Sequence, residues 1–586
     1  MKLKELQALS RRRFNLPKER PVRRTIQSFT LAERGIFYFL VAIFILSGFS
    51  LLWQVSQAYL VEVPTEGGTL VEGMVGTPRF INPVLALSEA DKNLTALVYS
   101  GLLRTTPAGT IENDLASNLE ISSDLLTYTL TIDENARFQD GTPISADDVV
   151  FTIQKIIDPL IKSPRRGNWE GVTVEKVDER TVAFRLKKPY APFIYNLTIG
   201  ILPRHIWKNV TADEFSFSQF NTLPVGSGLY QIGKAERNEG GIPDYYELSP
   251  FGKSLGRKPY LKTLGFRFYP SETALIEAYK NGEIESVSGL SPERITELEA
   301  LHGVVIHSPL SRIFAVFFNQ NHSRALLDKS VRQALDLTAP REDIIKDVFD
   351  GYAEVITGPL PAGLYSWTGL EASSTNPEKD LEKARKILSD GGWKTNSETG
   401  ILEKKNGSDT IALSFSISTG DAPELKEVAE KLSTSWQKLG ARVNVLVFET
   451  GELNQSVIRP RNFDALLFGE MVGRDADLYP FWHSSQRTDP GLNIALYANS
   501  KADKLLEEAR SESREKAEES YRAFAGEIAK DVPAVFLYTP NFLYVVPEKV
   551  KAVAMGSLLA SPDRFASIRD WYVETDKVWK IFLKNE

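Results

Sequence analysis

Residues of the types that most often do chemistry are few and scattered in this chain. The five histidines are His205, His302, His307, His322 and His483. They form no H-E-x-x-H motif, and the chain has no G-x-S-x-G motif. It also has no cysteine, which excludes disulfides, thiolate metal sites, cysteine nucleophiles and a lipid-modified N-terminal cysteine. We therefore expect no catalytic centre, no metal site and no cofactor.

The strongest candidate for ligand binding is the segment FGEMVGRDAD, from Phe468 to Asp477. It follows an apolar run, Phe463 to Leu467, which predicts a buried strand. Two glycines then leave backbone N–H and C=O groups accessible. The segment offers a backbone edge at Gly469, Glu470 and Met471, followed by the carboxylate of Asp475.

Each of these residues has a second interpretation. Asp475 and Asp477 suit a turn before Tyr479-Pro480-Phe481-Trp482 equally well. Glu470 either is buried, where it can hold a cation or an amine, or points to solvent. Ser418 and Thr419, which follow another predicted strand, are weaker candidates for lining the same site, because a plain strand end explains them as well.

The elements that must position such a site are clearest from Leu115 to Thr152. Tyr128, Leu130 and Ile132 alternate with threonines, which predicts a half-buried strand. Asp140-Gly141-Thr142-Pro143 predicts a turn. Ser145 then predicts a helix start, with its hydroxyl accepting a free backbone N–H.

This segment resembles the signature of solute-binding protein family 5, the oligopeptide-, dipeptide- and nickel-binding proteins of ABC importers. The matching pattern is S-x-D-x-x-x-Y-x-L followed by F-x-D-G-x-P-x-S-A-x-D-V-x-F, in which about fifteen residue types stand at fixed spacing. The later segments V-R-Q-A-L, from Val331, and G-P-L-P, from Gly358, are similar to family motifs too. Leu119 stands where the family often has tryptophan.

The resemblance implies an α/β, two-lobe periplasmic-binding-protein fold (type II, cluster C) with an extra subdomain. In peptide-binding relatives the loop that corresponds to Phe468–Asp477 reads G-W-x-x-D. Its backbone pairs with the peptide, and its Asp receives the peptide's α-ammonium group. Asp475 is the best counterpart of that Asp, and Glu470 replaces the family's Trp, which leaves the ligand class open.

The N-terminus predicts a membrane anchor. Residues 36 to 53 form an uncharged apolar run of 18 residues, preceded by ten basic and three acidic residues. The positive-inside rule therefore places residues 1–35 in the cytoplasm and exports the rest. Ser56-Gln57-Ala58 offers a signal-peptidase site, but the long basic segment favours an uncleaved anchor.

After the anchor the chain carries 59 basic and 73 acidic residues, a net charge of −14, so we expect no nucleic-acid partner. We predict a stalk at 54–66 and two lobes. Lobe I comprises 67–310 and 539–586, with the extra subdomain at 97–196, and lobe II comprises 311–538.

The resulting prediction is a single-pass, extracytoplasmic binding protein, not an enzyme, that captures peptides by hinge closure for ABC permease subunits. Two alternatives remain. The solute is a nickel chelate, a sugar or another small molecule, or the protein is a peptide chaperone or sensor without a transporter.

Overall fold

The computed structural model of the protein describes residues 26–299, 303–361, 377–473, 476–512 and 514–582. The chain separates into two compact units. One contains the described parts of Met1–Thr65 and Thr575–Glu586, and the other is Glu66–Glu574. We call the second the main unit.

The N-terminal unit consists of a long helix and a pair of strands. Helix α3 (Leu31–Tyr59) starts at a capping box, in which the Glu33 carboxylate accepts the Thr30 N–H at 2.8 Å. Its first 27 residues, Leu31–Gln57, are long and apolar enough to cross a membrane, as an anchor or as a signal sequence.

Strand β1 (Leu60–Pro64) then pairs antiparallel with β23 (Thr575–Trp579). A short helical turn, η7 (Lys580–Phe582), follows β23. The described residues Thr575–Phe582 thus group with the N-terminal segment, whereas the sequence predicts that 539–586 belong to lobe I.

Among the described residues of the main unit, twelve strands form one hydrogen-bonded sheet. They are β2 (Gly67–Val75), β9 (Tyr230–Arg237), β10 (Pro243–Pro250), β11 (Leu261–Tyr269), β12 (Ser286–Ser288), β13 (Gly303–Pro309), β14 (Arg312–Phe318), β15 (Ala353–Val355), β19 (Ser414–Gly420), β20 (Arg442–Phe448), β21 (Ala465–Met471) and β22 (Ala534–Pro547). Their order is β20-β19-β21-β14-β22-β12-β2-β11-β10-β9, and β13 and β15 also pair with β22. Parallel and antiparallel pairs are mixed, as in many α/β folds.

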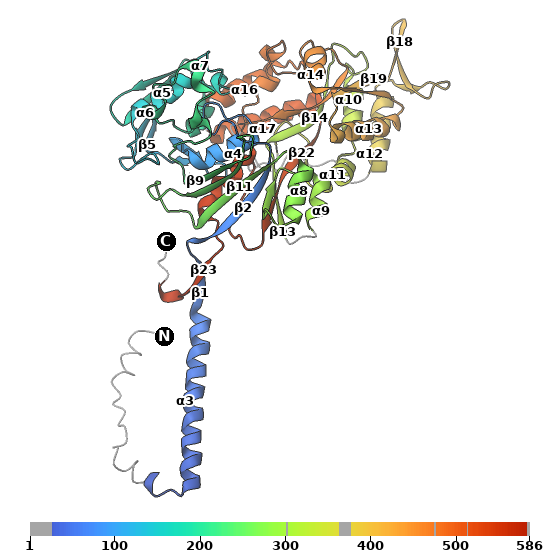
Figure 1. Ribbon diagram of the computed structural model, residues 1–586. Coiled ribbons are helices and arrows are strands. Elements are labelled where there is room, and N and C mark those ends of the chain that lie inside the picture. Colours follow the sequence, from blue (N-terminus) through green and yellow to red (C-terminus); the bar gives the residue numbers. More distant parts are fainter. Residues whose placement is uncertain (1–25, 300–302, 362–376, 474–475, 513, 583–586) are drawn as a thin grey trace. The chain divides into compact units, whose positions relative to one another are not determined.

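Strand β22 divides this sheet into two halves. The first half contains β2 and β9–β13, the second half contains β14, β15 and β19–β21, and β22 belongs to both. Its first part pairs with β14, with Phe314 opposite Tyr538, and its last part pairs with β13, with Pro309 opposite Asn541. Since only Leu310 and Ser311 join β13 to β14, the chain passes between the halves at two neighbouring crossings (Figure 1). The lobe boundaries at 310/311 and 538/539, which lie beside these crossings, and the movement of the halves as separate lobes both stay predictions.

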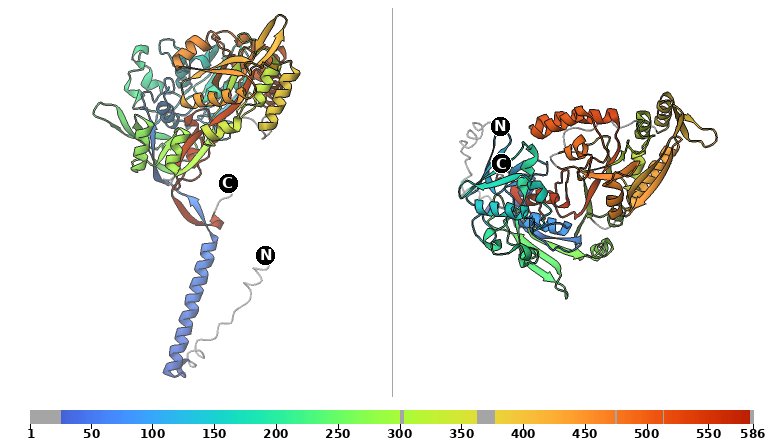
Figure 2. Two further views of the ribbon diagram at one scale, coloured as in Figure 1. Left: turned by 90° about the vertical axis from the view of Figure 1, so that its right-hand side faces the viewer. Right: turned by 90° about the horizontal axis from the view of Figure 1, so that it is seen from above.

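The first half carries a separate four-stranded sheet of order β5-β6-β8-β7 and a two-stranded one. Its further elements are α4 (Glu89–Val98), β3 (Leu103–Thr105), β4 (Ile111–Asn113), β5 (Ala116–Ile121), β6 (Thr127–Ile132), α5 (Ala146–Ile157), η1 (Arg166–Trp169), β7 (Val172–Lys176), β8 (Thr181–Leu186), η2 (Ala191–Thr198), α6 (Arg204–Trp207), α7 (Ala212–Phe215), η3 (Gln219–Asn221), α8 (Glu272–Lys280), α9 (Pro292–Glu299) and η6 (Ser561–Asp570). Figure 2 shows this small sheet and its helices at one end of the main unit.

The signature segment folds as a strand, a turn and a helix, as predicted. In β6 the side chains of Tyr128, Leu130 and Ile132 are buried. The helix cap differs in detail, because the Asp148 carboxylate accepts both the N–H and the hydroxyl of Ser145, at 2.9 and 2.8 Å. The sequence predicts a bond from a backbone N–H to the Ser145 hydroxyl. In its place, Ser145 donates to the Asp148 carboxylate, which is the other half of a capping box.

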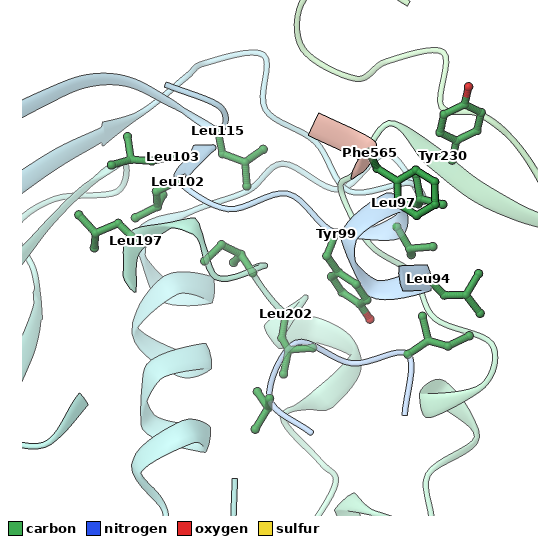
Figure 3. Packing of buried hydrophobic residues seen from close by; sticks show 14 of the residues in the cluster. Leu94, Leu97, Tyr99, Leu102, Leu103, Leu115, Leu197, Leu202, Tyr230 and Phe565 are labelled. Carbon is green, nitrogen blue, oxygen red and sulfur yellow. The ribbon is translucent and has the colours of Figure 1, made fainter. Parts of the chain in front are cut away.

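Apolar residues far apart in the sequence build the core of this half. Leu94 and Leu97 of α4 pack in one cluster with Leu197 of η2 and with Phe565 of η6 (Figure 3). Tyr99, just after α4, lies in the same cluster, and burial raises the pKa of its hydroxyl well above the ordinary value. Segment η6 (Ser561–Asp570), although near the C-terminus, is thus an integral part of the first half.

The second half surrounds its strands with helices and a hairpin. Its further elements are α10 (Lys329–Leu337), α11 (Arg341–Val348), α12 (Pro377–Asp390), β16 (Lys394–Thr395), β17 (Leu402–Asn406), β18 (Asp409–Ala412), α13 (Pro423–Gln437), α14 (Thr450–Glu452), η4 (Leu453–Ile458), α15 (Tyr479–Trp482), η5 (Ser484–Gln486), α16 (Ser500–Ser511) and α17 (Arg514–Asp531). Strand β19, helix α13 and strand β20 form a parallel βαβ unit. Asn406-Gly407 forms the hairpin turn between β17 and β18, as the Asn-Gly pair favours.

The arginine of the V-R-Q-A-L segment has a structural role. Arg332 is buried and donates to the backbone carbonyl oxygens of Leu326, Leu327, Asp531 and Val532 at 2.9–3.0 Å. These bonds tie the start of α10 to the end of α17 and replace the water that the guanidinium group loses on burial.

Candidate functional site

The segment proposed for ligand binding begins as a regular strand with one free edge. Strand β21 pairs with β14 along its whole length but with β19 only at Ala465 and Leu466. The Val472 N–H donates to the Ser311 carbonyl on the β14 side, at 3.0 Å. Because backbone groups alternate along a strand, those of Gly469 and Met471 face the other side. Within the described ranges, no strand pairs with that edge of β21 beyond Leu466.

Gly469 is required by packing. A Cβ atom at this position would lie 2.8 Å from the ring of Phe314 on the neighbouring strand. That ring stacks on Tyr538 with centroids 4.9 Å apart and an interplanar angle of 7°. The glycine therefore lets an aromatic pair pack under the sheet at the crossing between the halves.

Glu470 is buried, so it does not point to solvent. Its side chain is 4% exposed, and neither carboxylate oxygen has a hydrogen-bond partner among the described residues. Burial raises the pKa of Glu470 well above its ordinary value. Met471, the next residue, is about half exposed.

Ser418 and Thr419 are both buried in strand β19. The Thr419 hydroxyl donates to the Leu467 carbonyl at 3.2 Å and so continues the β19–β21 contact by one residue. This bond explains Thr419 as part of the sheet. Ligand contact by either residue stays a prediction.

Asp477 is committed to an ion pair. Its carboxylate accepts from Arg510 of α16, with a closest distance of 2.7 Å, and from the Tyr479 N–H at 3.2 Å. Arg510 also lies over the Tyr479 ring, 4.1 Å from the centroid. Asp477 therefore orders the turn, as the second interpretation held. Asp475, the predicted acceptor of an α-ammonium group, lies outside the described residues.

The same ion pair joins the two halves of the main unit. Tyr190, which precedes η2 in the first half, donates its hydroxyl to Asp477 at 3.4 Å. The Arg510 guanidinium group lies 5.3 Å from the Tyr190 ring centroid. We call Tyr190, Asp477 and Arg510 the interlobe latch. Sequence reasoning missed Tyr190 and Arg510, because no spacing pattern connects residues that lie so far from the loop.

The histidines that the structure describes form no common site. His205 pairs with Asp140 at 2.7 Å in the first half, and His322 pairs with Asp464 at 2.8 Å in the second. His302 lies outside the described residues. Among the residues that are described, no group of three or more His, Asp or Glu side chains is arranged to hold a metal ion.

Comparison with known sequences places these features in context. Residues 110–493 match the family model of the bacterial extracellular solute-binding proteins, family 5. The chain is 30% identical over 497 residues to the oligopeptide-binding protein AppA of Bacillus subtilis, covering 83% of this chain and 89% of that protein. It is 24% identical over 508 residues to the probable D,D-dipeptide-binding periplasmic protein of Escherichia coli, covering 84% and 92%.

Solved structures show the same fold. The structure of AppA from Bacillus subtilis in complex with a nonapeptide is 28% identical, with a TM-score of 0.63, and covers 87% of this chain and all of that one. NikZ from Campylobacter jejuni in complex with Ni(L-His) is 25% identical, with a TM-score of 0.64, and covers 86% and 99%. The main unit therefore has the two-lobe α/β fold, as predicted.

Proposed function

Since the chain belongs to family 5 of the bacterial extracellular solute-binding proteins, we propose that it is a membrane-anchored receptor that captures peptides outside the cytoplasm. In this proposal the two lobes close on the peptide and deliver it to an ABC importer. The observation that carries the proposal is the free edge of β21 at Gly469 and Met471, beside the crossings between the halves.

A free strand edge suits peptides because it binds them through the backbone. An extended chain added to such an edge is held by main-chain hydrogen bonds, which do not depend on its side chains. The relative of 30% identity is named an oligopeptide-binding protein, and its structure was solved with a nonapeptide. Both facts support a peptide as the ligand of this chain.

Two crossings support closure by a hinge. A pair of neighbouring connections permits rotation of one lobe on the other and restricts other motions. The latch of Tyr190, Asp477 and Arg510 also joins the two halves, and its residues lie far in sequence from the crossings. We therefore expect it to form when the lobes meet.

Helix α3 supports the anchor, and a topology follows from it. We expect the N-terminal residues to remain in the cytoplasm and residues from 67 onward to lie outside, because ten basic residues precede the span. Protease added to spheroplasts is expected to digest the main unit and to spare an N-terminal epitope tag. Digestion of the tag alone would reverse the topology, and loss of α3 from the mature protein would make it a signal sequence.

A second candidate function is the binding of another small solute, which the similarity to NikZ in complex with Ni(L-His) favours. A peptide chaperone or sensor without a transporter is also compatible with the same fold, because fold alone does not select the ligand.

Native mass spectrometry of the purified full-length chain separates these candidates. We expect the ligand that co-purifies to be a mixture of peptides, because backbone pairing tolerates many sequences. A sugar or a metal chelate in its place would remove the peptide assignment and leave the receptor. Cleavage of an added peptide by the pure protein would contradict both.

A further inference from the structure

Glu470 is one of three buried polar residues that lie near the crossings between the lobes. Ser311 is 1% exposed, Thr539 is 0% exposed and Glu470 is 4% exposed. In the described part of the chain, the hydroxyls of Ser311 and Thr539 have no hydrogen-bond partner, like the Glu470 carboxylate. We call these three residues the crossing cluster.

Strand pairing places the cluster on one face of the sheet. Ile313 of β14 lies opposite Glu470 of β21, and Ser311 stands two residues before Ile313, immediately ahead of the start of β14. On the other side of β14, Phe314 lies opposite Tyr538, which puts Thr539 beside the segment from Ser311 to Ile313. Side chains of opposite residues, and of residues two apart, point to the same face. Continued past the start of β14, this alternation puts the three side chains on the same face, with Ile313 between Glu470 of β21 and Thr539 of β22, and with Ser311 just ahead of β14.

Leaving such groups without partners is costly. A buried polar group without a hydrogen bond costs about 1–3 kcal/mol, and more when it is charged. Buried polar groups in proteins are therefore usually satisfied, and unsatisfied ones call for a ligand, a water or a functional reason. Three of them on one face, at the crossings of a binding protein, indicate a place that a ligand completes.

The donor set selects the kind of ligand group. A carboxylate accepts hydrogen bonds and carries negative charge, and two hydroxyls add acceptor oxygens. A protonated amine or a guanidinium group offers only donors and positive charge, so it matches all three. A divalent cation fits less well, because Ca²⁺ takes 6–8 oxygen ligands and Mg²⁺ about six, and the cluster has one carboxylate.

We propose that Glu470, with Ser311 and Thr539, holds a cationic nitrogen group of the captured ligand, either a lysine or arginine side chain or the α-ammonium group of a peptide. This assignment rests on the proposed function and names the ligand chemistry of the same site. The cation replaces the water that Glu470 loses on burial, and it lowers the raised pKa of the carboxyl group.

Calorimetric titration of the full-length chain in detergent tests the assignment. The probes are penta-alanine and its single-lysine variants, each with a free and with an acetylated N-terminus. We expect Glu470→Gln to weaken binding of the preferred cationic peptide by at least about 30-fold, because a desolvated charge pair loses one partner. For acetylated penta-alanine, which has no cation, Glu470→Gln is expected to change the affinity by less than about threefold.

The same probes identify the source of the cation. If a side chain supplies it, one lysine variant binds best and acetylation leaves the effect of Glu470→Gln in place. If the α-ammonium group supplies it, acetylation weakens binding to the natural chain and has no further effect on the variant. Ser311→Ala and Thr539→Val are expected to lose less peptide affinity than Glu470→Gln does, and to lose it only for the cationic probes.

Two controls separate a ligand role from a structural one. Glu452→Gln changes an exposed carboxylate of the same lobe and is expected to have no effect on any probe. The melting temperature of peptide-free Glu470→Gln is expected to stay the same or to rise, because the variant removes an unpartnered buried carboxyl group.

If Glu470→Gln bound the cationic peptides as tightly as the natural chain does, and the neutral ones too, the assignment would be overturned and the proposed peptide function would stand. Glu470 would then be satisfied by a buried water. A fall in melting temperature with unchanged peptide selectivity would also overturn it. Failure of the natural chain to bind any of the peptides would remove the proposed peptide function, and this assignment with it.

Discussion

Replacing Arg564 by methionine is expected to lower the free energy of unfolding by about 3–5 kcal/mol, because it leaves a buried carboxylate without its cation. Arg564 is 0% exposed and donates to Glu72, which is 2% exposed, at 2.6 Å. The same guanidinium group donates to Asn93 at 2.7 Å. Tyr544 donates to the other Glu72 oxygen at 3.0 Å. Urea denaturation of the full-length chain, followed by circular dichroism, measures the loss.

Two further variants show whether the unpaired charge causes the loss. Glu72→Leu combined with Arg564→Met is expected to recover much of the stability, because apolar pairs often replace buried ion pairs at little cost. Arg185→Met removes an exposed pair with Glu175 and is expected to cost less than about 1 kcal/mol. If Arg564→Met cost no more than Arg185→Met, the buried pair would have no special role.

This network matters for function because of the elements that it joins. Glu72 lies on β2, Asn93 on α4, Tyr544 on the last part of β22 and Arg564 in η6. Together they fix the part of β22 that follows the crossing within the first lobe. In the proposed hinge closure, a rigid first lobe transmits a local movement at the crossings to the rest of that lobe.

Asp477→Asn is expected to lower the free energy of unfolding by about 2–3 kcal/mol, because Arg510 then loses a charged partner in a half-buried position. The pair is well formed: the Asp477 side chain is 8% exposed and the Arg510 side chain 30% exposed, at 2.7 Å. Its charge-assisted bonds raise the pKa of Arg510 although burial opposes this. The variant is also expected to favour the open arrangement of the lobes, because the latch contact with Tyr190 weakens.

Tyr190→Phe is the matched variant for the latch, since it removes only the hydroxyl that reaches Asp477. We expect no loss of the free energy of unfolding beyond about 1 kcal/mol, together with a larger open population in the absence of ligand. If Tyr190→Phe destabilised the chain as much as Asp477→Asn and left the open population unchanged, the contact would be structural and not a latch.

Local patterns in the sequence predict the elements well. Alternation of Tyr128, Leu130 and Ile132 gives β6 directly, and Asn406-Gly407 gives the β17–β18 turn, because both depend on neighbouring residues only. The lobe boundaries at 310/311 and 538/539 stay a prediction.

Contacts between distant residues were not predictable in the same way. Glu72 and Arg564 are separated by almost the whole main unit, and neither residue type signals a buried pair. The choice between a turn and a ligand role for Asp477 depended on Arg510, which the sequence does not connect to the loop. Strand alternation alone also could not show whether Glu470 is covered, because this depends on the elements that pack on its face.

Closure of the lobes on a peptide is the central claim, and one distance distribution tests it most directly. Because the chain has no cysteine, spin labels can be attached at Lys188→Cys in the first lobe and Lys504→Cys in the second, both exposed. Double electron–electron resonance on the full-length chain then follows the distance between the lobes across the latch. We predict a broad distribution that includes long distances without peptide, and a single short distance when a peptide shown by calorimetry to bind is added. An unchanged distribution with that peptide bound would contradict capture by hinge closure.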